Sequence, residues 1–266
     1  MARTYVVTGS ASGIGATTSR MLTERGEKVI GVDLKNADVE ADLSTQEGRV
    51  AAAAKIVELS GGVVDAVIAC AGISAPRALT ISVNYFGVVN LLQELLPALG
   101  KSDAPRVAVV SSMASLQPNS PEIVDAALAG DEAKAVEIAD KLAEQGPQVG
   151  YAVYPSSKRA LSRWVRRASI SADYAGAGIA LNAVAPGTVL TPMTEGLLSD
   201  PDTVKMVDAS VPMPLNYHQK PESIAEVLIF LTSPANTHMA GQTIYVDGGA
   251  DASLRGDDIW SWNDPK

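Results

Sequence analysis

The chain has 266 residues, of which 47% are hydrophobic and 19% are charged, and its formal net charge is −9 at neutral pH. This length and apolar content suffice for one large α/β domain with a substantial core, and they exclude disorder of the whole chain. The negative charge argues against nucleic acid and anionic membranes as partners, because both normally require a basic protein surface.

The cysteine and the histidines do not predict a metal site. Cys70 is the single cysteine and lies in the apolar run AVIACAG, where we expect a buried small hydrophobe. His218 and His238 lie twenty residues apart without a cysteine cluster, so a zinc site is not expected. An apolar run begins at Thr4, leaving no room for a signal peptide, and no run approaches membrane length. We therefore expect a soluble, cytoplasmic protein.

Short apolar runs alternate with helical patterns along the chain. The runs are rich in valine and isoleucine and apolar throughout, which is typical of strands covered on both faces of a parallel sheet. Their repetition predicts a single-domain, doubly wound parallel α/β fold over residues 1–266. The expected strands are TYVV at 4–7, KVIGV at 28–32, DAVIA at 65–69, RVAVVS at 106–111, IALNAV at 179–184 and TIYV at 243–246, and the expected helices are 13–25, 46–59, 81–99, 154–175 and 222–232.

The first expected strand ends in the glycine-rich segment TGSASGIG, residues 8–15, and a helical pattern follows directly. Glycines there permit a tight turn, let the backbone approach a pyrophosphate and leave the helix N-terminus facing the anion. Asp33 ends the second expected strand, where an acidic side chain accepts hydrogen bonds from a ribose and repels a 2′-phosphate. The pattern favours a dinucleotide site that prefers NAD over NADP, although Lys35 is a nearby base. A purely structural turn is the alternative.

Two segments interrupt the alternation. Residues 116–150 are acidic, and their apolar positions recur at helical spacing, which predicts an inserted helical pair before the next helix. Residues 251–266 form a polar C-terminal tail in which Trp260 and Trp262 are expected to dock against the protein. The apolar positions of the inserted pair are Ile123, Ala127 and Leu128, followed by Val136, Ala139 and Leu142.

The segment GYAVYPSSKRAL, residues 150–161, contains two tyrosines and a lysine. On a helix, residues i and i+4 lie on one face, so Tyr154 and Lys158 can share a site. Tyr151 has Pro155 at the corresponding position. A free tyrosine has a pKa of about 10, and a neighbouring ammonium favours its phenolate. Taken alone, the segment also fits an ordinary helix start with Pro155 in the first turn.

A series of motifs in this order resembles the short-chain dehydrogenase/reductase family over essentially the whole chain. No single motif is decisive, but the ordered set is highly specific. The resemblance implies a Rossmann fold and hydride transfer with NAD. The motifs are TGSASGIG at 8–15, ACAG at 69–72, SVNYFG at 82–87, SS at 111–112, YPSSK at 154–158, PGTVLT at 186–191 and DGG at 247–249.

The resemblance implies a catalytic tetrad of Asn84, Ser112, Tyr154 and Lys158. In such a site Ser112 hydrogen-bonds the substrate oxygen, Tyr154 moves its proton, Lys158 holds the nicotinamide ribose, and Asn84 positions a relay water. Ser112 is preferred to Ser111 because it is the second of the pair. The alternative for Asn84 is a helical residue that satisfies backbone groups. The implied cofactor contacts are Gly9, Ser12, Gly13 and Ile14 at the pyrophosphate, Asp33 at the adenosine ribose, Asp42 and Leu43 at the adenine, Gly72 near the ribose, and Val189 and Thr191 at the carboxamide, with Tyr154 and Lys158 in both sets.

The distance in sequence from Ser112 to Tyr154 is unusual. It is 42 positions, and most family members have a much shorter segment. With ADLSTQEGR at 41–49 and DGGADA at 247–252, the insertion makes the chain similar to the bacterial 3α-hydroxysteroid dehydrogenase/carbonyl reductase subgroup. That similarity implies an alicyclic or steroid-like secondary alcohol, or its ketone, as the substrate. The alternatives are a ketoacyl-carrier reductase, for which this negative chain offers no obvious basic face, and a non-catalytic NAD-binding regulator.

The insertion also bears on assembly. Family tetramers usually pair the helices that begin near Asn84 and near Tyr154, and an added helical pair directly before Tyr154 should obstruct that surface. We therefore expect a homodimer through another face, involving the last strand and the tail. The alternative is a lid that leaves a tetramer intact. The substrate pocket itself is not readable, because five apolar residues can line it or belong to the core: Met113, Leu116, Met193, Leu197 and Leu198.

Overall fold

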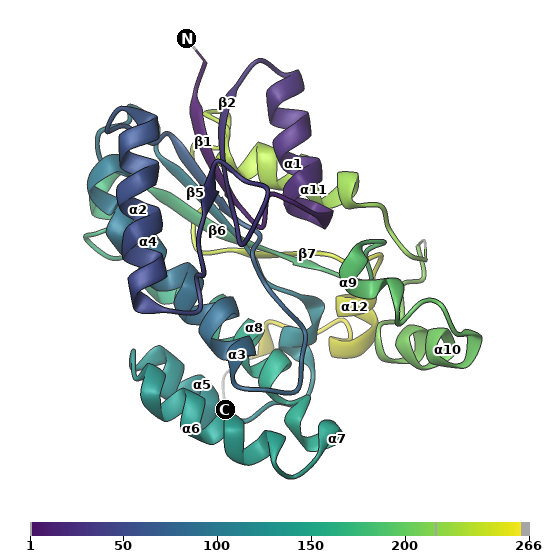
Figure 1. Cartoon of the computed structure of the whole chain (residues 1–266). Coiled ribbons are helices and arrows are strands. Elements are labelled where there is room, and N and C mark those ends of the chain that lie inside the picture. Colours follow the sequence, from purple (N-terminus) through teal and green to yellow (C-terminus); the bar gives the residue numbers. More distant parts are fainter. Residues whose placement is uncertain (1, 216, 262–266) are drawn as a thin grey trace.

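The computed structural model describes residues 2–215 and 217–261. Its centre is one sheet of seven parallel strands in the order β3-β2-β1-β4-β5-β6-β7, seen in Figure 1. The direction of winding reverses between β1 and β4, so the sheet is doubly wound, as predicted. The strands are β1 Thr4–Thr8, β2 Lys28–Asp33, β3 Val39–Glu40, β4 Ala66–Ala69, β5 Arg106–Val110, β6 Ala180–Pro186 and β7 Thr243–Val246.

Helices cover both faces of the sheet and create two cores. Along β1, Val6 lies in one core, whereas Tyr5 and Val7 lie in the other, as the alternation of a strand requires. Helices α2, α4 and α8 cover the first face, and α1 and α11 cover the second. Their bounds are α1 Gly13–Glu24, α2 Gln46–Ser60, α4 Gly87–Leu99, α8 Val153–Ala168 and α11 Pro221–Thr232.

The predicted insertion forms three helices, α5 Pro121–Leu128, α6 Glu132–Ala143 and the single turn α7 Pro147–Gly150. Helix α5 packs against both α6 and α8, and Figure 1 shows the insertion as a separate layer beside α8. Its two longer helices begin at side-chain caps, because Ser120 Oγ accepts from the Ile123 amide at 3.3 Å and Asp131 Oδ1 accepts from the Lys134 amide at 2.9 Å.

The third expected helix, 81–99, is interrupted at its start. The structure has α3 Leu79–Ile81, a π-helical turn Ser82–Phe86 and then α4. Together they form a helical stretch, Leu79–Leu99, that within the described residues is long and apolar enough to cross a membrane. However, 67% of its most apolar window is buried inside the protein, as in a core helix.

Other expectations need correction. Helix α8 ends at Ala168 and not at 175, because the chain turns back there and uses Gly178, at φ 73°, to enter β6. Trp260 is 68% exposed, so it does not dock against this chain, and Trp262 lies outside the described residues. Several short elements were not predicted, namely β3, the 3₁₀ turns Met113–Leu116 and Ala175–Ala177, α9 Pro192–Glu195, α10 Pro201–Ser210 and α12 Ala250–Arg255.

Candidate active site

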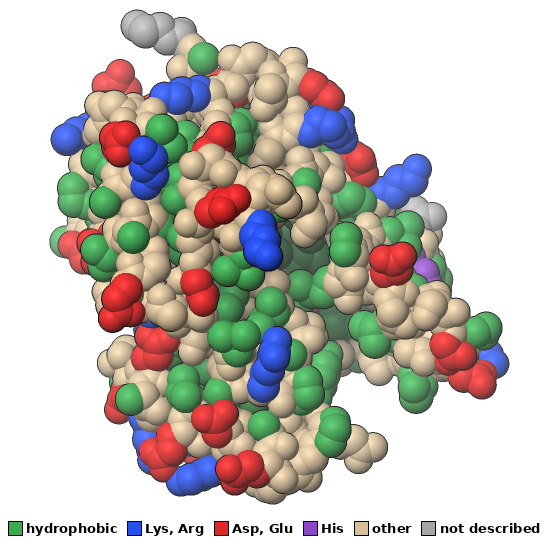
Figure 2. All heavy atoms as spheres, in the orientation of Figure 1, with side chains coloured by type: hydrophobic (Ala, Val, Ile, Leu, Met, Phe, Trp, Pro, Cys, Tyr) green, Lys and Arg blue, Asp and Glu red, His purple; other side chains and the backbone are tan. Residues whose placement is uncertain are grey.

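A cavity of about 430 Å³ lies at the carboxyl ends of the strands, where the strand order reverses. Figure 2 shows a hollow beside the region of α9 and α10, with hydrophobic side chains around it. Of the predicted site residues, Asn84 is not in the cavity wall. The others line it: Gly9, Ser12, Gly13, Ile14, Asp33, Asp42, Leu43, Gly72, Ser112, Tyr154, Lys158, Val189 and Thr191.

The glycine-rich loop at one side of the cavity has a backbone that only glycine can adopt. Gly9 has φ 68°, and a Cβ there would lie 2.9 Å from the Ala71 amide nitrogen. A Cβ on Gly15 would lie 2.1 Å from the carbonyl oxygen of Gly9. Helix α1 begins beside this loop without a side-chain cap and without an acidic residue in its first turn. Its first N–H groups therefore suit an anion such as a pyrophosphate.

Two aspartates lie at the adenosine end of the cavity. The Asp33 carboxylate accepts hydrogen bonds from the amides of Ala11, at 3.0 Å, and Leu34, at 2.7 Å. Asp33 thus anchors the glycine-rich loop, and its remaining lone pairs are available to ribose hydroxyls. Asp42 Oδ1 accepts from the Ser44 amide at 2.9 Å. Lys35, the base noted beside this site, is not among the residues that line the cavity.

Three polar side chains meet at the other end of the cavity. Tyr154 and Lys158 lie one turn apart on α8, with Lys158 Nζ 5.9 Å from the centroid of the tyrosine ring. Lys158 Nζ also donates to the Val110 carbonyl oxygen at 2.8 Å, which fixes the ammonium. Ser112 Oγ accepts from the Ala114 amide at 3.1 Å, so its own proton remains free to donate.

Ser111, the alternative serine, has its hydroxyl turned toward α8. Its Oγ donates to the Lys158 carbonyl oxygen at 3.1 Å and lies 2.8 Å from Ser162 Oγ. Ser111 is also buried. It therefore holds α8 against β5. Both serines line the cavity, but only the Ser112 hydroxyl is not engaged with α8.

Burial dominates the electrostatics of the tyrosine and the lysine. It raises the pKa of Tyr154 to about 12, an effect that the Ser112 hydroxyl opposes. Burial also lowers the pKa of Lys158 to about 8, so the ammonium remains the main form at neutral pH. Cys70, in the cavity wall near Lys158, is kept as a thiol because burial raises its pKa to about 12. The resting site therefore holds a neutral phenol and a cationic lysine.

Asn84 lies behind the cavity wall, on the π-helical turn. Its side chain is completely buried; Oδ1 accepts from the Ile73 amide at 2.8 Å, and Nδ2 donates to the Ile73 carbonyl oxygen at 2.9 Å and to Ser157 Oγ at 3.1 Å. Both amide donors are thus occupied, and one lone pair of Oδ1 remains for a water. A Cβ on Gly72 would lie 3.1 Å from Asn84 Oδ1 and 3.5 Å from Lys158 Nζ. Because Gly72 has no side chain, Asn84 Oδ1 and Lys158 Nζ can lie close to its backbone.

Some lining residues were not identified from the sequence. They include Cys70 and Arg77, the latter on the loop after β4. Met193 also lines the cavity, whereas Met113 is buried in a small core with Met213. The remaining apolar candidates, Leu116, Leu197 and Leu198, do not line it. In the described part of the chain, no group of three His, Cys, Asp or Glu side chains could hold a metal ion.

Comparison with known proteins gives consistent matches along the chain. A family model described as short chain dehydrogenase matches residues 3–127, and one described as enoyl-(acyl carrier protein) reductase matches residues 123–251. A 3-alpha-hydroxysteroid dehydrogenase/carbonyl reductase of Comamonas testosteroni is 38% identical over 94% of this chain and 97% of its own length. A cis-4-hydroxycyclohexanecarboxylate dehydrogenase of Sinomonas cyclohexanicum is 32% identical over 93% and 96%, respectively.

A solved structure is similarly close. The crystal structure of a 3-alpha-hydroxysteroid dehydrogenase from Pseudomonas sp. B-0831 complexed with NADH has a TM-score of 0.87 to this chain. It is 39% identical in sequence, and the match covers 96% of this chain and 100% of that one. The similarity therefore extends over the insertion as well as over the sheet.

Proposed function

The chain belongs to the short-chain dehydrogenase family, and we propose that it transfers hydride between NAD(H) and a secondary alcohol or its ketone. The preferred substrate in this proposal is alicyclic or steroid-like, because both named relatives act on an alcohol carried by a carbon ring. The observation that carries the proposal is one cavity with Asp33 at one end and Ser112, Tyr154 and Lys158 at the other. We also propose that the enzyme is soluble and cytoplasmic; the packing of Leu79–Leu99 in the core supports the first of these two properties.

The residues of the cavity wall fit this cofactor, and each would have a separate role in the reaction. NAD, when bound, supplies the hydride acceptor of the reaction. Ser112 would donate its free hydroxyl proton to the substrate oxygen, and Tyr154 would take the hydroxyl proton during oxidation or return it during reduction. Lys158 would stabilise the phenolate by its charge and has two N–H groups beyond the one given to Val110 for a ribose. Asn84 would hold a water through the free lone pair of Oδ1.

A substrate panel tests this proposal. The purified protein is mixed with NAD⁺ and a 3α-hydroxysteroid, a 4-hydroxycyclohexanecarboxylate or a linear secondary alcohol, and with NADH and a β-ketoacyl thioester. We expect the nicotinamide absorbance to change fastest with the two cyclic alcohols. Turnover of the thioester alone would indicate a ketoacyl reductase, and NAD binding without any turnover would indicate a regulator.

The position of Asp33 predicts the choice of cofactor. NAD should bind more tightly than NADP, because the carboxylate accepts from the ribose hydroxyls and repels a 2′-phosphate. Asp33→Ala should reduce the preference by about tenfold or more, the size expected for losing a hydrogen bond to a charged group. The measurement is the Kd of each cofactor by titration calorimetry.

Asp33→Asn is the matched control, because it removes the charge but keeps an acceptor for the Ala11 amide. It should improve NADP binding with less loss of NAD binding than the alanine variant. Equal dissociation constants for NAD and NADP in the unmodified protein would contradict the role given to Asp33.

We also propose that the protein is a homodimer. Helix α5 packs on α8, and α6 packs on α5, so the insertion covers the α8 surface through which family tetramers usually pair. In contrast, β7 is an edge strand, and the following tail exposes apolar side chains, with Leu254 47%, Ile259 45% and Trp260 68% accessible. An edge strand beside exposed apolar residues suits a two-fold interface.

Light scattering at micromolar concentration should give the mass of two chains. Replacing residues 118–147 by a short turn should uncover α8 and produce four chains. A mass of four chains for the unmodified protein would show that the insertion does not block the second interface, as expected for a lid.

A further inference from the structure

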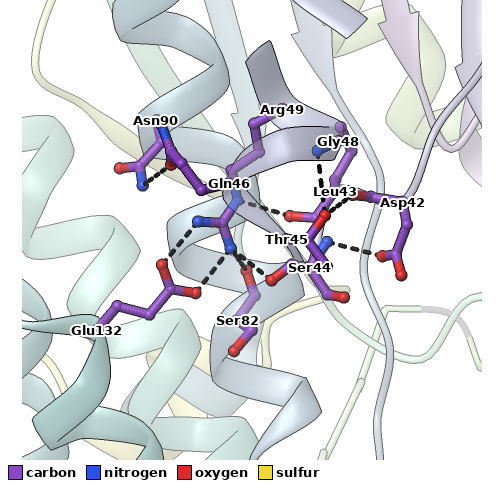
Figure 3. A network of polar contacts seen from close by, with 10 residues as sticks. All are labelled: Asp42, Leu43, Ser44, Thr45, Gln46, Gly48, Arg49, Ser82, Asn90 and Glu132. Carbon is purple, nitrogen blue, oxygen red and sulfur yellow. Dashed lines mark hydrogen bonds and ion pairs between the residues drawn. The ribbon is translucent and has the colours of Figure 1, made fainter. Parts of the chain in front are cut away.

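Arg49 is a fully buried cation whose guanidinium joins three segments of the chain, as Figure 3 shows. Nε donates to the Leu43 carbonyl oxygen at 2.8 Å, and Nη2 donates to those of Ser44 at 2.9 Å and Ser82 at 3.2 Å. Glu132 completes the set with two parallel contacts, from Nη1 to Oε2 at 2.6 Å and from Nη2 to Oε1 at 2.7 Å. This is the bidentate geometry that makes arginine–carboxylate pairs strong.

The segments joined by Arg49 belong to different parts of the molecule. Leu43 and Ser44 follow β3, and residues 41–43 form the cavity wall at its adenosine end. Ser82 begins the π-helical turn. Glu132 is the first residue of α6, in the insertion, 83 positions from Arg49. Helix α6 is thus joined, through the Arg49 side chain, to residues 41–44, which we call the adenosine-end loop.

The adenosine-end loop depends on this contact for its shape. A Cβ on Gly48 would lie 1.9 Å from the Asp42 carbonyl oxygen, and one on Gly87 would lie 2.9 Å from that of Leu43, so helices α2 and α4 press closely on the loop. Its carbonyl groups point inward, where Arg49 is the donor that meets those of Leu43 and Ser44. Buried carbonyl groups without a donor are costly.

Arg49 in turn requires Glu132. An arginine side chain stays charged in proteins, and a buried charge is tolerated only when it is paired. The contacts of the guanidinium with Leu43, Ser44 and Ser82 are all to neutral carbonyl groups, and Glu132 contributes the opposite charge. Removing the Glu132 charge would favour a conformation in which Arg49 is exposed to water. The carbonyl groups of Leu43 and Ser44 would then lose their donor.

We propose that Glu132 is a positioning residue for the adenosine end of the cofactor site. Acting through Arg49, it holds Asp42 and Leu43 in the conformation that receives the adenine, so helix α6 of the insertion sets the affinity for NAD. This inference rests on the proposed NAD site. It assigns the insertion a role in cofactor binding that is separate from its role at the α8 surface.

The test compares Glu132→Gln with Glu137→Gln. Glu137 lies on the same helix, about half exposed, and pairs with Lys134 and Lys141 at the surface, so its variant removes an equal charge without touching Arg49. We expect Glu132→Gln to raise the Kd of NAD about tenfold, as when about a tenth of the molecules keep the competent loop. The Kd of ADP-ribose, which carries the adenosine half, should rise in parallel. The Glu137→Gln variant should bind both as the unmodified protein does.

A second readout separates positioning from a general structural role. In Glu132→Gln the KM for NAD should rise, while kcat at saturating NAD and the KM for the alcohol stay unchanged. An NAD affinity equal to that of the unmodified protein would overturn the inference, and so would an equal loss of kcat and of alcohol binding. If the unmodified protein binds no NAD, the proposed function itself fails, which is a different result.

Hydrogen exchange on the unmodified protein covers the case in which Glu132→Gln does not fold. Because coupling between two sites is reciprocal, NAD binding should slow amide exchange in residues 132–136. Exchange in α10, which lies on the opposite side of the molecule from α2 in Figure 1, provides the internal comparison. Unchanged exchange at 132–136 with NAD bound would overturn the inference without any variant.

Discussion

Replacing Tyr154 by phenylalanine is expected to lower kcat by at least about a hundredfold, the lower end of what general acid–base catalysis contributes. The change removes the hydroxyl that moves the proton but keeps the ring beside Lys158 and the shape of the cavity. NAD binding should therefore stay close to its unmodified value. The measurements are steady-state turnover of a cyclic alcohol and the Kd of NAD by calorimetry.

Tyr151→Phe is the matched control for this variant. Tyr151 lies three residues earlier, 45% exposed, with its ring centroid 6.2 Å from that of Tyr154. Removing its hydroxyl should leave kcat nearly unchanged. If Tyr154→Phe kept more than about a hundredth of the activity, Tyr154 would not be the acid and base of the reaction.

The pH profile gives a second check on the same residue. Oxidation needs the phenolate as the base, and burial raises the pKa of Tyr154 to about 12, so the phenolate is the minor form at neutral pH. Below that pKa the phenolate fraction rises about tenfold per pH unit, and oxidation should accelerate with it. Burial lowers the pKa of Lys158 to about 8. On the proposed role of Lys158, in which its charge would stabilise the phenolate, the rise should therefore flatten near pH 8. A deuterated alcohol shows, by its full kinetic isotope effect, whether hydride transfer limits the rate. If it does and the rate of oxidation is still independent of pH below pH 8, Tyr154 is not the base.

The fold was largely predictable because its strands are buried on both faces. Continuous valine- and isoleucine-rich runs identify such strands without knowledge of their partners. The two-residue β3 is too short to carry a pattern, and the end of α8 depends on where β6 begins. Trp260 shows a different limit. A tryptophan near a terminus suggests docking, but the partner surface does not have to belong to the same chain.

The candidate site was predictable where backbone geometry restricts the residue type. Gly9 and Gly15 are required by close approaches of the backbone, and the four-residue spacing places Tyr154 and Lys158 on one helix face. The family resemblance is confirmed by relatives that match over nearly the whole chain. In contrast, the hydrogen bonds that occupy the Asn84 amide depend on Ile73 and Ser157, which no local pattern connects to it.

Arg49 illustrates why such contacts escape sequence reasoning. An arginine in a helical pattern is normally expected at the surface, and its partner Glu132 lies 83 positions away in the insertion. The segment ADLSTQEGR and the insertion are separate in the sequence, and no local pattern connects them. In this chain the Arg49–Glu132 pair joins them, because each segment provides one of the two charges.

Removing Arg49 should therefore destabilise the whole fold. Arg49→Met leaves Glu132 without its partner and the carbonyl groups of Leu43 and Ser44 without their donor. The Glu132 side chain is 29% exposed and can be hydrated, so the main loss is at the carbonyl groups. Each buried carbonyl group without a donor costs about 1–3 kcal/mol, so the two together should lower the unfolding free energy by about 2–6 kcal/mol. Urea unfolding at a fixed protein concentration, analysed for variants with equal m-values, measures this loss.

Arg163→Met is the control for that measurement, because Arg163 pairs with Asp125 at 3.6 Å on the surface, with the two side chains 45% and 73% exposed. It should change the unfolding free energy by less than about 1 kcal/mol. The double variant Arg49→Met/Glu132→Leu should recover part of the loss, since it leaves no unpaired charge behind. An Arg49→Met protein as stable as the Arg163→Met protein would mean that the buried pair contributes no more than a surface pair. The insertion would then be held on the sheet by the apolar contacts of α5 with α8 alone.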